Sequence, residues 1–181
     1  MKIKKLLSMI AAASCLAMGG FVANKISKPA TVQASVQSTE VKTFTNLLNQ
    51  YRSKRGARKL HTKAWLTKRS KVRFNEFVRT FKKTGTLDGH KRPNGTMCFT
   101  AFGKYKYRIS ENEGYLYSSS TISPKDAATQ LFDQFMYHDA GSHWVHRDNL
   151  RNKQARYLFV HFATVKKDGI NNYLVMAHTG K

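Results

Sequence analysis

Apolar residues recur at helical spacing in three segments of this 181-residue chain. The first helix is predicted over residues 41–53, where an i, i+3, i+4, i+7 pattern begins at Phe44, and Gly56 would follow its end. The second is predicted over residues 63–83, with an apolar stripe that runs from Phe74 to Phe81. The third begins at Ser123-Pro124, since Ser is favoured as the N-cap residue and Pro in the first turn.

β-rich segments fill much of the remaining chain. Residues 157–165 and 173–178 are rich in β-branched and aromatic side chains, and turn-forming residues join them, which predicts a hairpin. Residues 105–109 alternate in polarity and predict a strand that leads into Glu111. This order predicts an α+β domain, a small antiparallel sheet with helices packed on its faces.

Three short motifs place chemically capable side chains beside turn-forming residues. They follow one another in the order His, Glu, His over about 60 residues, as a site assembled from distant loops would require. The motifs are His90-Lys91-Arg92-Pro93-Asn94-Gly95, then Ser110-Glu111-Asn112, then Gly141-Ser142-His143-Trp144-Val145-His146-Arg147-Asp148-Asn149-Leu150.

Together these motifs resemble the CAP (SCP/PR-1-like) domain in its secreted bacterial form. That family has His-x-Arg-Pro-Asp-Gly, then Gly-Glu-Asn, then Gly-His-Arg-x-Asn-Leu, and the resemblance extends from about Phe44 to His178. Two departures are Ser110 and Val145, which stand where the family has Gly. The resemblance implies a three-layer α-β-α sandwich with a small antiparallel sheet.

The resemblance also implies a cleft lined by His90, Glu111 and His146. A fourth, acidic member normally comes from the helix before the second His, and Asp139 is the best candidate, with His138 as the alternative. Two imidazoles with carboxylates can bind zinc or a similar divalent metal, and the same set can perform general acid–base chemistry. A purely structural hydrogen-bonded cluster is the third interpretation, and the sequence leaves all three open.

Charge is the next strong feature. The chain has 32 Lys and Arg residues against 10 Asp and Glu residues, a net charge of +22, and residues 42–92 alone hold 16 basic and 2 acidic side chains. The second helix is therefore predicted to present a basic face for polyanions, either an anionic cell-surface polymer or lipid, with nucleic acid as a further option. The alternative interpretation is a solvated surface that only confers solubility. The residues assigned to this face are Lys68, Arg69, Arg73, Arg79, Lys82 and Lys83.

The N-terminal residues have the composition of a secretion signal. A basic start, an apolar Ala-rich stretch and small residues before Ser35 predict a signal peptide over residues 1–34, removed by cleavage before Ser35. Residues 35–41 are expected to form a short disordered lead-in, and residues 42–181 the CAP domain. Only Cys98 would remain after cleavage, which excludes an intramolecular disulfide and favours a Gram-positive exterior.

Two functions are consistent with these features. The first is a secreted CAP-type binding or interaction module that acts at the cell surface and is retained by the cell wall through its charge. The alternative is a secreted metal-dependent hydrolase, a peptidase or nuclease, using His90, Glu111, Asp139 and His146. The binding module is favoured because no nucleophile motif accompanies the cluster, and Cys98 is interpreted as a small buried hydrophobe.

Overall fold

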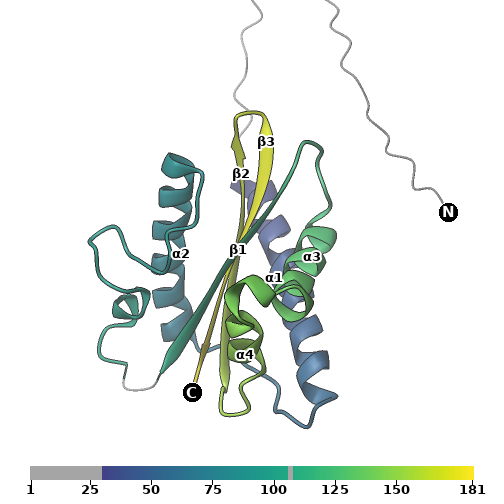
Figure 1. The fold of residues 1–181 in the computed structure, drawn as a ribbon, viewed down its shortest axis with the longest axis vertical. Coiled ribbons are helices and arrows are strands. Elements are labelled where there is room, and N and C mark those ends of the chain that lie inside the picture. The colour runs from purple at the N-terminus through teal and green to yellow at the C-terminus, as the bar shows by residue number, and fades with distance from the viewer. Residues whose placement is uncertain (1–29, 106–107) are drawn as a thin grey trace, which may run out of the picture.

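The computed structural model describes residues 30–105 and 108–181, with side chains from residue 39 onward (Figure 1). The helices are α1 Ala30–Ser53, α2 Ala64–Thr84, α3 Pro124–Tyr137 and α4 Val145–Arg151, with 3₁₀ turns at Cys98–Phe102 and Ala140–Ser142. The strands are β1 Ile109–Ser118, β2 Tyr157–Lys167 and β3 Ile170–Gly180.

The N-terminal predictions fall partly outside this part of the chain. Residues 1–29 of the expected signal peptide lie outside the described residues. Helix α1 begins at Ala30, so it runs through residues 35–41, which we expected to be a disordered lead-in. None of the helices in the described ranges combines the length and hydropathy that a membrane span requires.

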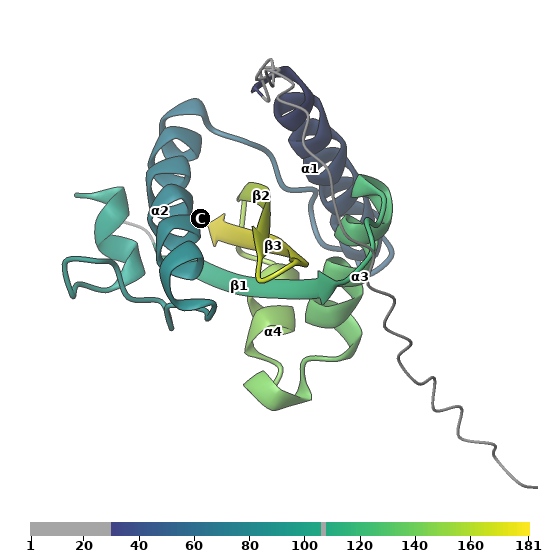
Figure 2. The same cartoon turned by 90° about the horizontal axis from the view of Figure 1, so that it is seen from above.

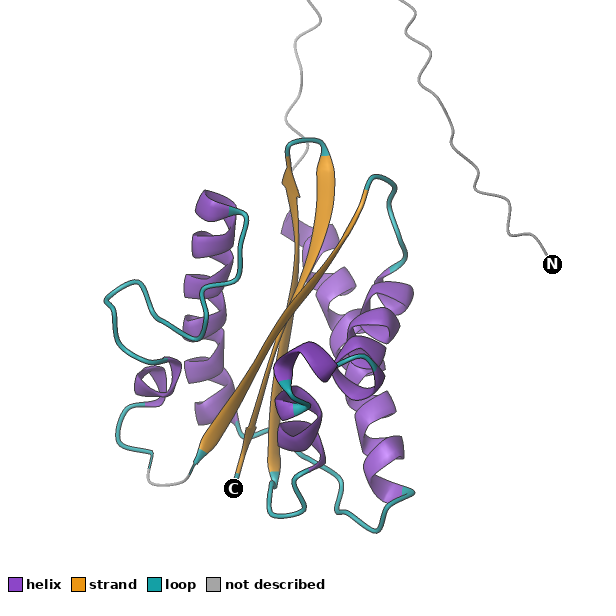
Figure 3. Ribbon diagram, in the orientation of Figure 1, coloured by secondary structure: helices purple, strands orange, loops and turns teal. Residues whose placement is uncertain are grey.

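The three strands form one antiparallel sheet with the order β1-β3-β2. Seen from above, α2 covers one face of the sheet, whereas α1, α3 and α4 lie on the other (Figure 2). This is the three-layer α-β-α sandwich that the CAP resemblance implied, and the predicted fold class is confirmed. The distribution of helices and strands is also seen directly in Figure 3.

The central strand β3 is buried on both faces, so its residues divide between two cores. Tyr173, Val175 and Ala177 join the core under α1 and α3, while Leu174 and Met176 join the core under α2. Successive side chains of a strand point to opposite faces. A strand that is covered on both faces must therefore be apolar almost throughout, which explains the unbroken run 173–177 in the sequence.

The local signals for α3 and the hairpin were correct, and a strand does run through Glu111, but Tyr105 and Arg108 are not part of it, and residues 106–107 lie outside the described residues. Ser123 caps α3, its Oγ accepting a hydrogen bond from the Asp126 backbone N–H at 3.1 Å. Strand β1 begins only at Ile109, which pairs with Gly180 at the end of β3. Gly180 is the last residue of β3, so β1 has no pairing partner before Ile109. From Ile109 the strand continues through Glu111 to Ser118.

Candidate functional site

Strand β1 brings the three sequence motifs together. Glu111 and Asn112 are neighbours in β1, so their side chains point to opposite faces of the sheet. Glu111 accepts a hydrogen bond from His90 on the α2 side, whereas Asn112 Nδ2 donates to the His146 carbonyl at 2.9 Å on the α4 side. Asn112 also accepts a 2.9 Å hydrogen bond from Asn149, so the middle motif connects the other two.

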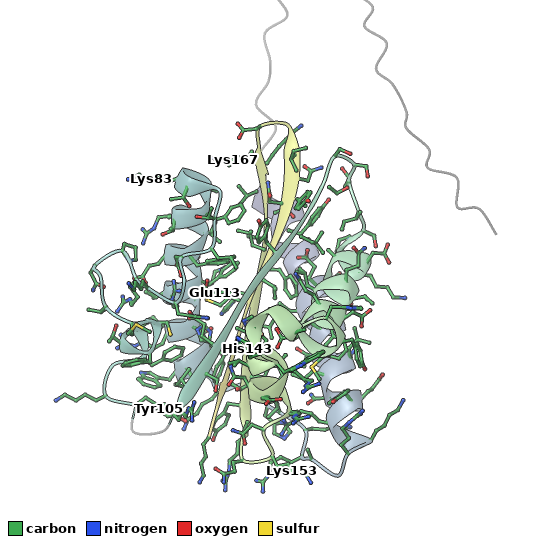
Figure 4. All side chains as sticks on the ribbon, in the orientation of Figure 1. Lys83, Tyr105, Glu113, His143, Lys153 and Lys167 are labelled. Carbon is green, nitrogen blue, oxygen red and sulfur yellow. The ribbon has the colours of Figure 1, made fainter. Side chains whose placement is uncertain are left out.

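His90 is held by two glutamates from the same face of β1. It has a left-handed backbone with φ of 64°, unusual for a residue with a side chain, and follows Gly89 with the same φ. Its Nδ1 lies 3.1 Å from Glu111 Oε1 and 3.2 Å from Glu113 Oε1, and its backbone N–H donates to Glu113 at 3.0 Å. Figure 4 shows Glu113 on the α2 side of β1.

Arg73 joins His90, Glu111 and Glu113 in one buried cluster, so its assignment to the exposed basic face was wrong. Its side chain is 0% exposed, and its guanidinium makes a two-point contact with Asp88 at 2.7 and 2.8 Å. The same Nη2 lies 2.9 Å from Glu111 Oε1 and 2.9 Å from Glu113 Oε1. Three carboxylates draw this guanidinium into the sheet–helix interface, because a buried charge is stable only when it is paired.

The close packing of opposite charges shifts the pKa values of this cluster. Hydrogen bonds to Glu111 and Glu113 raise the pKa of His90 to about 10. Burial raises the pKa of Glu113 to about 7, although His90 opposes the shift. Burial would also raise the pKa of Glu111, but hydrogen bonds from His178 and His90 and the charge of Arg73 lower that pKa well below its ordinary value. His90 is therefore an imidazolium at neutral pH.

A second chain of polar contacts leads from Glu111 into the core. Glu111 Oε2 lies 2.6 Å from His178 Nε2, and His178 Nδ1 lies 2.8 Å from Ser70 Oγ. The same Ser70 oxygen is 3.0 Å from His161 Nε2. Burial lowers the pKa of His161 to about 3, so this ring is neutral. Ser70 and His178 are fully buried, which excludes Ser70 as a nucleophile for any substrate in solution.

His146 and Asp139 form a separate pair on the α3–α4 side of the sheet. His146 Nδ1 lies 2.7 Å from Asp139 Oδ1, and Asp139 also accepts hydrogen bonds from Ser142 Oγ and the Arg147 backbone N–H. Burial would raise the pKa of Asp139, but the Ser142, Arg147 and His146 contacts lower it.

A groove of about 240 Å³ connects this second pair with β1. His146 and Asp139 line it together with Glu113. The Glu113 carboxylate also contacts His90, which does not line the groove. The four predicted site residues form two separate pairs, His90 with Glu111 and His146 with Asp139, and the groove is lined by the second pair but not by His90 or Glu111. Glu113 is the residue that links them. The alternative fourth member, His138, lines the same groove and is exposed.

Among the described residues, His90, Cys98 and Glu111 are the set whose potential metal ligands lie close together, within 4.8 Å of one another. Both Glu111 oxygens, however, already accept hydrogen bonds from Arg73, His90 and His178. A metal at this point would have to displace the proton of His90 and share the carboxylate with a guanidinium. The donor set therefore fits an ion-paired cluster better than a metal centre.

Three residues of the site, Glu113, Asp88 and His178, were not predicted from the sequence, and Arg73 was predicted on the wrong side of its helix. Two of these had a readable signal. Glu113 follows Glu111 by two residues, so in any strand both face the same side. Arg73 precedes Phe77 by four residues and therefore lies on the apolar stripe of its helix. His178 and Asp88 carried no such signal, since only the strand register and the loop path bring them to Glu111.

The comparisons with known proteins agree with this architecture. An outer surface protein from Borrelia burgdorferi has a similar fold, with a TM-score of 0.50 and 17% sequence identity, over 78% of this chain and 92% of that one. A search of curated proteins found no match. The sequence profile of the CAP group, described as the cysteine-rich secretory protein family, matches residues 45–177. The chain therefore belongs to the CAP family.

Proposed function

We propose that this protein is a secreted CAP-type binding module whose second helix attaches it to an anionic polymer of the cell envelope. The observation that carries the proposal is a group of exposed cationic side chains on α2, which we call the basic face. Its members are Lys68, Arg69, Arg79, Lys82 and Lys83. Figure 4 shows Lys83 at the end of α2, pointing away from the sheet.

No acidic side chain of α2 offsets this charge. Glu76 is the one carboxylate in α2, and it is buried and paired with Arg92 at 2.7 and 2.8 Å. The nearby Asp88 forms a buried ion pair with Arg73. The field outside α2 is therefore positive along its length, which favours a repeating polyanion over a single charged group. The expected leader over residues 1–34 would deliver the domain to such a polymer.

The proposal predicts attachment that depends on charge and salt. A variant with Lys68, Arg69, Arg79 and Lys82 all changed to Glu should remain folded and bind isolated cell walls much more weakly than the parent. Binding of the parent should fall steeply as salt rises, because exposed charges are screened over about 10 Å at 0.1 M salt.

A matched control reverses four exposed lysines outside α2: Lys42, Lys59, Lys125 and Lys166. This control changes the net charge by the same amount, so it should retain most of the binding if the basic face is the attachment surface. An equal loss of cell-wall binding in both variants would show that binding depends on net charge and not on the basic face. Preference for anionic vesicles or DNA over wall polymer, at equal salt, would reassign the partner.

A hydrolase is the second candidate, and the His146–Asp139 pair favours it. A carboxylate at Nδ1 orients the imidazole and leaves Nε2 for proton transfer, and His146 is 20% exposed in its side chain and lines the groove. The test is turnover of peptide and nucleic-acid substrates by the parent and by His146→Ala. Activity that survives in His146→Ala would remove this pair from the reaction.

A further inference from the structure

A cavity of about 530 Å³ lies where the C-terminal end of α1 meets α4 and the turn that follows it. It is on the opposite side of the sheet from the basic face and contains none of the groove residues. Figure 4 shows Lys153, one of its lining residues, at this end of the molecule. The charged lining residues are Arg52, Arg55, Asp148, Arg151 and Lys153.

Arg52 is the unusual member of this lining, because it is 1% exposed and has no acidic partner among the described residues. Its Nη1 donates to the carbonyls of Leu150 at 2.7 Å and Asn152 at 3.0 Å, and its Nε donates to the Arg58 carbonyl at 2.9 Å. Within the part of the chain that the structure describes, its Nη2 has no hydrogen-bond partner. Burial, together with the nearby charge of Arg58, lowers the pKa of Arg52.

The contrast with Arg73 is informative. Both side chains are buried arginines, but Arg73 meets three carboxylates, whereas Arg52 meets none from residues 39–105 and 108–181. The carbonyls of Leu150 and Asn152, at the end of α4, account for Nη1 of Arg52, but neutral carbonyls leave its positive charge uncompensated. A buried cation of this kind is costly unless an anion compensates it.

The other charges of the cavity also point to an anionic ligand. Arg55, Arg151 and Lys153 are exposed, and Asp148 is the one acid of the lining. Asp148 is already engaged, with Arg151 at 3.2 Å and Arg147 at 3.5 Å. The face of the Arg55 guanidinium stacks on the Tyr51 ring at 3.7 Å, which leaves its N–H edge free to donate.

We propose that this cavity binds a phosphate ester, with the phosphoryl oxygens accepting hydrogen bonds from the arginine side chains. Planar guanidinium groups match phosphate oxygens in two-point contacts, and the bound anion would supply the counter-charge that Arg52 lacks. A cavity of about 530 Å³ is larger than one phosphate, so there is room for an attached sugar or glycerol group.

The test is calorimetric titration of the purified protein with inorganic phosphate and with glycerol 3-phosphate, against KCl at equal ionic strength. Both should bind, and the ester should bind more tightly because it fills more of the cavity. Changing Arg55, Arg151 and Lys153 together to Gln should weaken binding by about tenfold or more, since each charged hydrogen bond is worth a considerable factor in affinity. These side chains are exposed, so the variant should still fold.

Three further measurements distinguish the possible outcomes. The Arg52 side-chain ¹⁵N resonances should shift on addition of phosphate, and the variant with Glu at Lys68, Arg69, Arg79 and Lys82 should bind phosphate like the parent. Vesicles of phosphatidylcholine with and without phosphatidylglycerol distinguish a lipid headgroup from a free ester. Unchanged phosphate affinity in the Gln variant, or unchanged Arg52 resonances, would overturn the proposal. Neither result would bear on the proposed binding of the basic face of α2 to the cell envelope.

Discussion

Replacing Arg73 by Met is the most direct test of the buried acidic cluster. The change keeps an unbranched side chain on α2 but removes a guanidinium that donates four hydrogen bonds of 2.7 to 2.9 Å to Asp88, Glu111 and Glu113. Three carboxylates with side-chain exposures of 4%, 1% and 3% then lose their common partner.

Breaking a buried ion pair by removal of one partner costs roughly 3–5 kcal/mol in free energy of unfolding. Taken separately, four charge-assisted hydrogen bonds would amount to about 6–12 kcal/mol. The loss in free energy of unfolding should be nearer about 3–5 than about 6–12 kcal/mol. The reason is that Glu113, with a pKa raised to about 7, can take up a proton and become neutral. We therefore expect a loss of about 3–5 kcal/mol at neutral pH, a large part of the stability of a typical domain.

The control is Arg69→Met on the same helix, since Arg69 is exposed and its guanidinium lies 5.7 Å from the Trp65 ring centre. That change should alter stability by about 0.5 kcal/mol or less. Both variants are compared with the parent by urea denaturation. If Arg73→Met is as mild as Arg69→Met, Arg73 is a surface residue and the cluster as described does not exist.

The same pair of variants makes a prediction for pH. The folded-state pKa of Glu111 is lowered, partly by Arg73, so its contribution to stability is present above the ordinary value of 4.5 and is lost as pH falls below it. The stability difference between parent and Arg73→Met should therefore shrink on acidification below about pH 4.5. A difference that grows on acidification would contradict this account.

Four further predictions test other parts of the molecule. His90→Gln should flatten the loss of stability between about pH 6.5 and 10. The pKa of His90 is raised to about 10, so its charged form stabilises the fold fully below the ordinary pKa of 6.5, and this contribution is lost as pH rises toward 10. Urea denaturation at several pH values checks this, and an unchanged slope would contradict it. His146→Ala should cost about 1–3 kcal/mol if its main role is to hold a buried aspartate, whereas a catalytic role predicts lost turnover with little loss of stability. Gly114→Ala should cost about 1–3 kcal/mol by overpacking, since its Cβ would lie 2.9 Å from the Phe135 ring, and thermal unfolding comparable to the parent would disprove that contact. N-terminal sequencing of protein from culture medium should begin at Ser35; a sequence that begins at Met1 would refute the cleavage.

Much of the fold was predictable because its signals are local. The apolar stripe of α2, the Ser123 cap of α3 and the β-rich runs of the hairpin each depend on neighbouring residues, and all three predictions were correct. The extent of β1 depends instead on where β3 ends, and its start at Ile109 is set by pairing with Gly180. No pattern within residues 105–118 contains that information.

The site was predictable only in part, for a similar reason. The motifs identified His90, Glu111, Asp139 and His146, but motif order does not say which face of a strand each residue meets. Since Glu111 and its neighbour Asn112 face opposite sides of the sheet, the two histidines are held by different acids. Cys98 was interpreted as a buried hydrophobe, yet it is half-buried beside His90 and Glu111, where burial raises its thiol pKa to about 12.

The distribution of acids connects the buried cluster with the proposed function. The chain has 10 acidic residues, of which Glu40, Glu76, Glu111, Glu113 and Asp139 are buried, and the Asp88 side chain is 4% exposed. The two acids within the basic region 42–92 are both turned inward, Glu76 toward Arg92 and Asp88 toward Arg73. A carboxylate that is paired with an arginine away from the basic face does not offset the lysines of that face. The solvent-facing side of α2 therefore carries cationic side chains with no carboxylate among them, because one interior arrangement both binds the loop of His90 to the sheet and holds the acids of this region away from the basic face.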